Sequence, residues 1–221
     1  VYTPSGYDND PAGRYPVLHL QHGSGEAEWS WTGQGKANFI LDNLIAEGKA
    51  RPMLVVMDSG YALPPGARAD QRDKNLFGDV LIRELVPEID RSFRTEGTRT
   101  GRALAGLSMG AGQALRIGLA NLEVFSSIAA LSGGGRNFDP STSYDGIFAT
   151  PEQANNQLDL LWLGCGRQDG GFAGAKGMHE ALESAGVAHV WYELEGSHDW
   201  GVWRRHLYDQ AQLLFGGPKP Y

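Results

Sequence analysis

The chain has little cysteine, no long apolar run and no excess of positive charge, and each shortage excludes a class of protein. Its one cysteine, Cys165, excludes an internal disulfide and a cysteine-rich metal site. Lysine and arginine number 19 against 26 aspartates and glutamates, which leaves a formal net charge of -7 and no basic stripe to neutralise phosphates. No stretch approaches the roughly 18 uninterrupted apolar residues that span a bilayer. We therefore predict no nucleic-acid partner and no membrane partner.

Glycine and tryptophan, in contrast, are plentiful, at 31 and 6 residues. Glycine serves tight turns and tryptophan often builds apolar recognition surfaces, so this composition predicts many loops around a pocket. The 221 residues suit one domain of ordinary size, and we expect residues 1–221 to form it. Residues 1–25 lack the basic start and apolar run of a signal peptide. Cys165 ends an apolar run, which predicts a buried, inert thiol.

Short apolar runs alternate with segments of helical periodicity along the whole chain. Strands are predicted at residues 15–21, 53–57, 102–107, 126–131, 158–165 and 187–194. Helices are predicted at residues 36–48, 75–89, 109–120, 173–185 and 202–215. Residues 61–72 and 138–157 are predicted to be irregular, the second as an excursion over the site. This alternation predicts an α/β fold with a mostly parallel sheet and helices on both faces.

The segment Gly106–Gly110 is the only Gly-x-Ser-x-Gly in the chain, and it lies between a predicted strand and a predicted helix. In a nucleophile elbow the serine adopts a strained backbone conformation, and the flanking glycines let the strand and the helix approach each other closely. This context predicts that Ser108 is a nucleophile. The alternative is a glycine-rich turn with an incidental serine.

A serine hydroxyl needs a general base within hydrogen-bonding reach, and imidazole is the usual one. His198 lies in a loop directly after the last predicted strand, where the carboxyl-edge loops of a parallel sheet converge. The other histidines lie within or beside predicted strands or on helices: His19, His22, His179, His189 and His206. We therefore predict that His198 is the base, and we assign His22 a structural role in its loop.

The third member of a triad is a carboxylate that orients the imidazole, and in α/β-hydrolases it follows a strand between the serine and the histidine. Asp169 fits this description, because it follows the predicted strand that ends at Cys165. A turn-capping role is the alternative for Asp169. Weaker candidates lie in the irregular segment, before a strand or beside His198: Asp139, Asp145, Asp159 and Asp199.

Acyl transfer also needs two donors for the tetrahedral intermediate, one from the residue after the nucleophile and one from the loop after an earlier strand. We predict the backbone N–H groups of Met109 and Ser24. Four tryptophans are expected near the nucleophile, two after this loop and two after the base: Trp29, Trp31, Trp200 and Trp203. They favour an aromatic acyl group, with Phe138 as a further wall of its pocket. Core packing is the alternative, and it is preferred for Trp203, which lies within a predicted helix.

The motifs together resemble those of a known family. They comprise Val-Tyr-Thr-Pro-Ser-Gly-Tyr-Asp at 1–8, Tyr-Pro-Val-Leu-His-Leu-Gln-His-Gly at 15–23, Asp-Asn-Leu-Ile-Ala-Glu-Gly at 42–48, Ala-Gly-Leu-Ser-Met-Gly at 105–110 and Gly-Ser-His-Asp-Trp at 196–200. Through nearly its whole length the chain resembles the esterase D-like α/β-hydrolases, and most closely the bacterial feruloyl and acetylxylan esterases of carbohydrate esterase family 1. The resemblance implies the α/β-hydrolase fold, a triad of Ser108, Asp169 and His198, and hydrolysis of small acyl groups from plant polysaccharide without a cofactor.

Two departures from the family pattern carry expectations of their own. Ala111 stands where the family usually has a second glycine, and we expect its methyl group to be tolerated and to tighten the packing of the helix. Family members also carry strands before the Tyr-x-Pro-x-Gly-Tyr-Asp segment. We therefore expect a leader and edge strands to be missing from this chain, which fits a secreted or periplasmic enzyme.

The leading hypothesis is a secreted serine esterase that releases ferulic or related hydroxycinnamic acids, or acetyl groups, from plant cell-wall polysaccharide. An esterase for enterochelin-type siderophores or other small esters is the first alternative, since related enzymes share the elbow. The others are an acyltransferase, as in the mycolyl transferases that resemble this group, and a non-catalytic carbohydrate-binding protein. No metal is predicted, because the histidines and carboxylates show no close ligand spacing such as His-Glu-x-x-His.

Overall fold

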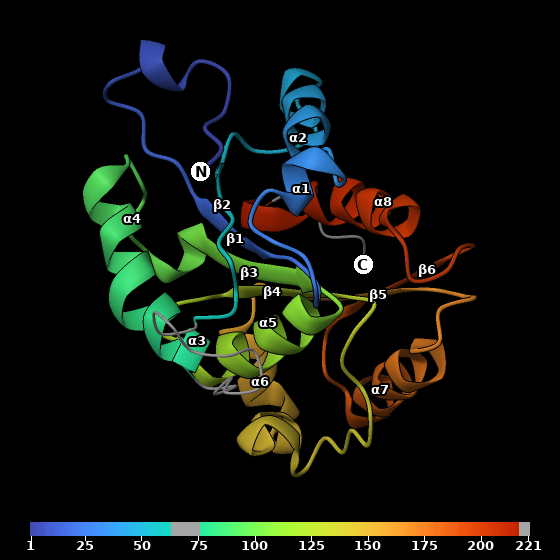
Figure 1. The fold of residues 1–221 in the computed structure, drawn as a ribbon. Helices are drawn as coiled ribbons and strands as arrows, with labels where there is room; N and C mark the ends of the chain where they lie inside the picture. The colour runs from blue at the N-terminus through green and yellow to red at the C-terminus, as the bar shows by residue number, and fades with distance from the viewer. Residues whose placement is uncertain (63–75, 217–221) are drawn as a thin grey trace.

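The computed structural model describes residues 1–62 and 76–216, and within them a parallel sheet of six strands runs through the molecule (Figure 1). In chain order the strands are β1 Val17–Gln21, β2 Leu54–Val56, β3 Arg102–Leu107, β4 Ser127–Leu131, β5 Leu160–Gly166 and β6 Val190–Leu194. They lie side by side in the order β2-β1-β3-β4-β5-β6. Since every pair is parallel, the carboxyl ends of all strands lie at one edge of the sheet.

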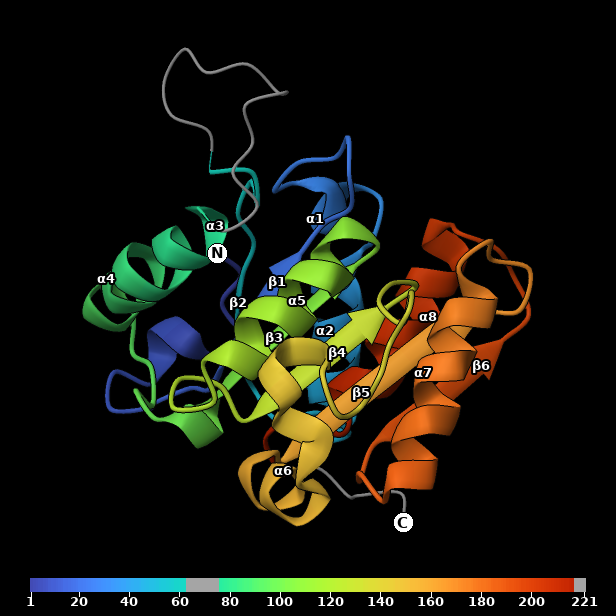
Figure 2. The same ribbon diagram turned by 90° about the horizontal axis from the view of Figure 1, so that it is seen from below.

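Helices cover both faces of this sheet, as the alternation in the sequence predicts. One face carries α1 Ser30–Gly33, α2 Ala37–Ala46 and α8 Trp200–Ala211 (Figure 1). The other carries α3 Leu76–Val80, α4 Val86–Ser92, α5 Met109–Ala120, α6 Pro151–Gln157 and α7 Phe172–Ala185. Figure 2 views this second face and shows α5, α6 and α7 in front of the strands, with α2 behind them. Short 3-10 helices lie at Tyr7–Asn9, Arg99–Gly101, Ser143–Ala149 and Leu214–Gly216.

The hydrophobic core has a layer on each side of the sheet, because successive residues of a strand point to opposite faces. On β3, Ala103 and Ala105 pack in the layer under α2 and α8, whereas Leu104 packs in the layer under α5. On β5, Trp162 and Leu163 divide in the same way. Strands buried on both faces read as continuous apolar runs, and this is why they could be recognised from the sequence.

Two predicted segments differ from the structure in their type of secondary structure, and the helix predicted at 202–215 is α8, Trp200–Ala211, followed by the separate 3-10 helix Leu214–Gly216. Residues 138–157, predicted to be irregular, contain α6 and the 3-10 helix Ser143–Ala149. Proline begins α6, where its missing N–H leaves no hydrogen bond unmade, and Ala154 is the buried residue of this polar helix, so its periodicity was hidden. The helix predicted at 75–89 contains a π-helical turn, Leu81–Leu85, which ends two residues before Pro87. Residues 63–72 of the predicted loop lie outside the described residues.

The carboxyl edge of the sheet brings distant parts of the chain together. The loop after β1 begins at His22, β3 runs into Ser108, β5 is followed by Asp169, and His198 follows β6. The register pairs Gln21 with Gly106, Leu107 with Leu131 and Gly166 with Leu194, so these strands end at nearly the same level. Among the described helices, none combines the length and the apolar character that crossing a membrane requires.

Candidate active site

Ser108 occupies a sharp turn between β3 and α5. Its φ of 52° and ψ of -111° place it in a region that residues other than glycine rarely adopt, so the neighbouring structure has to hold it there. The Ser108 N–H donates to the Leu131 carbonyl at 2.9 Å, which continues the hydrogen bonding of β3 to β4 up to the turn. The strained elbow predicted from the sequence is therefore confirmed.

The two elbow glycines are required by close approach. A Cβ atom on Gly110 would lie 2.7 Å from the Gln21 Cβ atom and 2.7 Å from the His22 carbonyl oxygen. A Cβ atom on Gly106 would clash with the Gly110 carbonyl. The first turn of α5 thus rests directly on the end of β1. Ala111, one position further, is fully buried within the core layer of α5.

Ser108, His198 and Asp169 form a continuous chain of hydrogen bonds. Nε2 of His198 lies 2.9 Å from Oγ of Ser108, and Nδ1 of His198 lies 2.7 Å from Oδ2 of Asp169. When Nδ1 donates its hydrogen to the carboxylate, Nε2 is free to accept the hydrogen of the serine hydroxyl. The structure therefore brings the three predicted residues together in the arrangement that activates a serine.

Asp169 is held as a carboxylate beneath the imidazole. Its side chain is 3% exposed, whereas that of His198 is 44% exposed. Burial raises the pKa of Asp169, but hydrogen bonds from the Gly171 N–H at 2.8 Å and from His198 outweigh it and hold this pKa below its usual value. Asp169 is consequently ionised at neutral pH and can stabilise a positive charge on His198.

The neighbouring candidates have other partners. Oδ1 of Asp199 accepts from the N–H groups of Gly201 and Val202 at 2.8 and 3.1 Å, so Asp199 caps the start of α8. Asp139 binds Ser141 in an exposed turn. Burial raises the pKa of the Cys165 thiol to about 12, which agrees with the predicted inert role.

The loop after β1 passes directly beside the nucleophile. A Cβ atom on Gly23 would lie 3.4 Å from the Ser108 Cβ atom. The ring nitrogens of buried His22 lie 2.7 Å from the carbonyl oxygens of Gly23 and Ser59, which confirms its predicted structural role. His22 thereby ties this loop to the loop after β2.

Two further side chains hold the same loop, and sequence reasoning missed both. Oε2 of Glu26 accepts from the Gly23 N–H at 2.8 Å, and the Tyr61 hydroxyl accepts from the Gly25 N–H at 2.7 Å. The spacing of Glu26 from Gly23 was available as a signal, because three-residue separations are common in side-chain turns. Tyr61 lies 36 residues from its partner, and no local pattern indicates it.

The predicted donors are Ser24, in the loop after β1, and Met109, the first residue of α5. Neither backbone N–H donates to an acceptor among residues 1–62 and 76–216. Two such N–H groups are what a tetrahedral oxyanion requires. Their role as an oxyanion hole stays a prediction.

The predicted tryptophan wall is wrong for Trp31. Its side chain is fully buried, and its Nε1 donates to the Gln21 carbonyl at 2.9 Å, so it offers no surface to a substrate. The ring instead contacts Trp200 edge to face, with centroids 5.1 Å apart, and Trp200 contacts Trp203 in the same way at 5.2 Å. Trp203 is buried, as predicted, and its ring lies 5.0 Å from that of His198.

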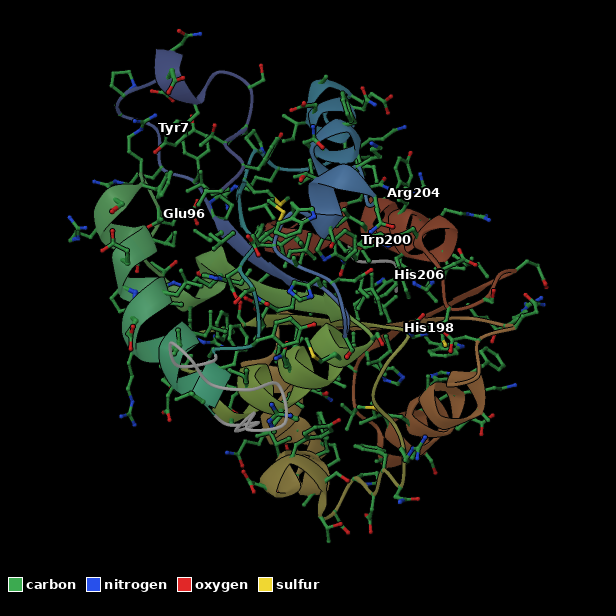
Figure 3. All side chains as sticks on the ribbon, viewed as in Figure 1. Tyr7, Glu96, His198, Trp200, Arg204 and His206 are labelled. Atoms are coloured by element: carbon green, nitrogen blue, oxygen red, sulfur yellow. The ribbon has the colours of Figure 1, made fainter. Side chains whose placement is uncertain are left out.

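Trp203 therefore packs against the imidazole of His198, and Trp200 and Trp31 extend this aromatic cluster away from it. Figure 3 shows Trp200 and His206 on α8 and His198 just before it, on the opposite side of the molecule from Tyr7 and Glu96. Trp29 is 64% exposed, so it alone of the four presents most of its surface to solvent. Half-buried Phe138 packs against Tyr144 and Phe148, with centroids 6.2 and 6.0 Å away. Substrate contacts by Trp29, Trp200 and Phe138 stay predictions.

Known proteins match this chain over nearly its whole length. Residues 1–214 match the family described as "Putative esterase". An endo-1,4-beta-xylanase/feruloyl esterase of Xylanibacter ruminicola is 40% identical over 97% of this chain. The chain belongs to this esterase family. The esterase spans 29% of that relative's length. An acetyl esterase of Caldicellulosiruptor saccharolyticus is 24% identical, over 66% of this chain and 67% of its own.

Solved structures confirm the predicted α/β-hydrolase fold. A carbohydrate esterase family 1 ferulic acid esterase of Anaeromyces mucronatus, bound to ferulic acid, superimposes on the esterase with a TM-score of 0.75 and 26% identity, over 97% of this chain and 83% of its own. An S-formylglutathione hydrolase of Staphylococcus aureus superimposes with a TM-score of 0.70 and 16% identity, over 97% of this chain and 91% of its own.

Proposed function

We propose that this esterase releases ferulic or related hydroxycinnamic acids from plant cell-wall polysaccharide, with Ser108 as nucleophile, His198 as general base and Asp169 as the carboxylate that orients the base. The observation that carries the proposal is the hydrogen-bond chain from Ser108 to Asp169 on a strained elbow. The similarity to a xylanase/feruloyl esterase and to a ferulic acid esterase bound to its acid supports the substrate. The proposed catalytic domain spans residues 1–221.

The first half of the reaction forms an acyl-enzyme. Oγ of Ser108 attacks the ester carbonyl carbon while Nε2 of His198 accepts the hydroxyl proton. The carbonyl oxygen becomes an oxyanion, which accepts hydrogen bonds from the N–H groups of Ser24 and Met109. The imidazolium then donates its proton to the sugar oxygen as the bond between that oxygen and the acyl carbon breaks. The sugar leaves as an alcohol, and the acyl group stays on Ser108.

The second half releases the acid. Water enters the site of the departed sugar, His198 accepts one of its protons, and the resulting hydroxide attacks the acyl carbon. The second tetrahedral intermediate uses the same two N–H donors, and its collapse returns the proton from His198 to Oγ of Ser108. Each step uses side chains of this chain and water, so the proposed reaction needs no cofactor.

The proposal places the enzyme outside the cytoplasm, in the periplasm or in the surrounding medium. Plant cell-wall polysaccharide does not enter the cytoplasm intact, so an esterase that acts on it has to lie outside the cytoplasm. The name of the Xylanibacter relative, which joins a xylanase with a feruloyl esterase, supports action beside xylan-cleaving enzymes.

Deacetylation is the second candidate activity. The relative from Caldicellulosiruptor is an acetyl esterase, and the S-formylglutathione hydrolases among the structural neighbours are named for a one-carbon acyl group. The triad geometry serves either acyl group equally, because it acts on the carbonyl and not on the rest of the acid. The acyl pocket therefore decides between the two.

The test is a substrate panel measured with recombinant protein: methyl ferulate, methyl sinapate, p-nitrophenyl acetate and feruloylated arabinoxylan, with released acid quantified by chromatography. We expect release of ferulate from the polysaccharide and a higher kcat/KM for methyl ferulate than for p-nitrophenyl acetate. Ser108→Ala should abolish both activities, and Ser92→Ala, an exposed serine on α4, should abolish neither. Activity confined to acetyl esters would favour the second candidate, and full activity of Ser108→Ala would contradict both.

A further inference from the structure

Gln168 ties the loop that carries Asp169 to the loop that carries His198, and we propose that it is a positioning residue for this pair. The inference rests on the proposed function, since it takes Asp169 and His198 as parts of the catalytic site. Gln168 immediately precedes Asp169 in the loop after β5, and it does not touch the nucleophile in any hydrogen bond of the described residues. Its effect on catalysis therefore acts through the two loops.

The backbones of the two loops continue the pairing of their strands. The β5–β6 register ends with Gly166 opposite Leu194. Beyond it, the Arg167 N–H donates to the Leu194 carbonyl at 2.9 Å, and the Gln168 N–H donates to the Gly196 carbonyl at 3.0 Å. These bonds bring the residue before Asp169 next to the loop that leads to His198.

The side-chain amide of Gln168 uses both of its functional groups on the His198 loop. Its Oε1 accepts from the Gly196 N–H at 2.6 Å, and its Nε2 donates to Oε2 of Glu195 at 2.6 Å. An amide is the group that fits this position, because one neighbour is a donor and the other is an acceptor. Glu195 also accepts from Arg167 at 3.0 Å, so its carboxylate is held from two sides.

The two loops pack so closely that no side chain fits between them at Gly166. A Cβ atom on Gly166 would clash with the Gly196 carbonyl oxygen. Gly196 has a φ of 136°, and a Cβ atom there would clash with Val202 on α8. Gly196 is separated from His198 by one residue, Ser197. A displacement of Gly196 would therefore also displace the imidazole of His198. Its Nδ1 must stay within hydrogen-bonding distance of Asp169.

Loss of the Gln168 contacts should affect catalysis and stability to different degrees. Gln168, Arg167 and Glu195 are exposed, and polar contacts at an exposed surface contribute little to the free energy of unfolding. Displacement of a catalytic group by about 1 Å, in contrast, can lower a rate by about a hundredfold. Loss of the Gln168 contacts should thus reduce kcat much more than thermal stability.

An exchange of the two side chains tests the proposal. Gln168→Glu places a second carboxylate against Glu195, and we expect kcat to fall by about tenfold to a hundredfold with KM changed less than about twofold. Glu195→Gln keeps an acceptor for the Gln168 amide and should cost less than about threefold in kcat. The double variant Gln168→Glu/Glu195→Gln restores complementarity, because the new carboxylate accepts from both the Gly196 N–H and the new amide. It should recover most of the lost kcat.

A matched control and a second readout complete the experiment. Gln212→Glu at the C-terminal end of α8 changes the same side chain beside the Tyr208 carbonyl and should leave kcat unchanged. The rate at which a fluorophosphonate probe labels Ser108 should follow kcat through the whole series. Labelling reports on the serine and its base whatever the natural ester is, so the proposal is tested even if the wild-type protein fails to hydrolyse hydroxycinnamate esters.

The outcomes are distinct. Absence of ferulate release with normal labelling contradicts the proposed substrate and leaves the labelling series to decide the role of Gln168. Unchanged kcat and labelling in Gln168→Glu would overturn the positioning role. That role is also overturned if the double variant stays as slow as the single one, or if the loss of kcat only parallels a loss of thermal stability. Absence of labelling in the wild-type protein overturns both proposals.

Discussion

Oδ2 of Asp169 lies 2.7 Å from Nδ1 of His198, with the carboxylate buried and the imidazole half open to solvent. The acid comes from the loop after β5 and the base from the loop after β6, so the contact crosses between neighbouring strands at the carboxyl edge of the sheet. A buried, ionised partner at Nδ1 fixes the tautomer that carries its hydrogen on Nδ1. Nε2, which lies against Ser108, can then accept a proton. This relationship supports the first prediction.

Asp169→Asn should lower kcat by about 10⁴-fold, because the amide can donate to Nδ1 and then favours the tautomer with its hydrogen on Nε2. KM should change little, since the substitution keeps the shape of the side chain. Steady-state kinetics with methyl ferulate measure both constants, and circular dichroism checks the fold. Asp145→Asn, an exposed aspartate that the sequence left as a weaker candidate, should keep full activity. Equal losses in the two variants would contradict the assignment of the acid.

The elbow glycines give a prediction about packing. Gly110→Ala should lower the free energy of unfolding by about 1–3 kcal/mol, because its Cβ atom would lie 2.7 Å from the Gln21 Cβ atom and 2.7 Å from the His22 carbonyl oxygen. Activity should fall as well, since the displaced backbone leads into the loop with Ser24. Gly112→Ala on the same helix is the matched control, because its Cβ atom meets nothing within 4 Å. That control should raise stability by about 0.5–1 kcal/mol in urea denaturation, through its higher helix propensity.

Truncation of two tryptophans only two residues apart should change the free energy of unfolding by very different amounts. Trp31→Ala removes a fully buried indole and should lower the free energy of unfolding by about 3–5 kcal/mol. Trp29→Ala alters a side chain that is 64% exposed, so stability should change by less than about 0.5 kcal/mol. If Trp29 contacts the acyl group, KM for methyl ferulate should rise while KM for p-nitrophenyl acetate stays the same. An unchanged KM for both esters would remove Trp29 from the substrate site.

Buried histidines predict how stability depends on pH. Burial lowers the pKa of His206 to about 3, and it lowers the pKa of His19 to about 3 as well. In the unfolded chain both titrate near 6.5, so below about pH 6 the unfolded state binds protons that the folded state does not. The free energy of unfolding should therefore fall as the pH decreases from about 6.5 towards 3, by up to about 1.4 kcal/mol per pH unit for each histidine.

Urea denaturation at intervals between pH 7 and pH 4 measures this slope. His206→Leu removes one of the two groups and replaces it with a side chain of similar volume among Trp162 and Tyr192. Its free energy of unfolding should fall less steeply with decreasing pH than that of the wild-type protein, because unfolding of the variant takes up about one proton fewer. Parallel curves for the two proteins would show that His206 does not titrate differently in the two states.

Much of the fold could be predicted because the strands and the main helices are recognisable from local patterns of residues. β3 and α5 have the bounds expected from the sequence, and Ser108 lies between them as predicted. The helix α6 was not predicted, because its one buried residue, Ala154, leaves no apolar periodicity to detect. The positions of Asp169 and His198 after neighbouring strands followed from chain order, and the structure brings both into hydrogen-bonding contact with their expected partners.

The sequence by itself determined the strand-to-helix elbow, the two glycines around Ser108 and the order of the three polar residues, since each depends on residues that are close in the chain. Only the tertiary structure decided which tryptophan faces the core, because Trp29 and Trp31 have the same side chain and the same local setting. The contacts of Gln168, Glu195 and Tyr61 also arise only on folding, since their partners lie 28, 27 and 36 residues away. Hydrogen bonds over such separations depend on which loops the parallel sheet places side by side, and no local pattern of residues encodes that.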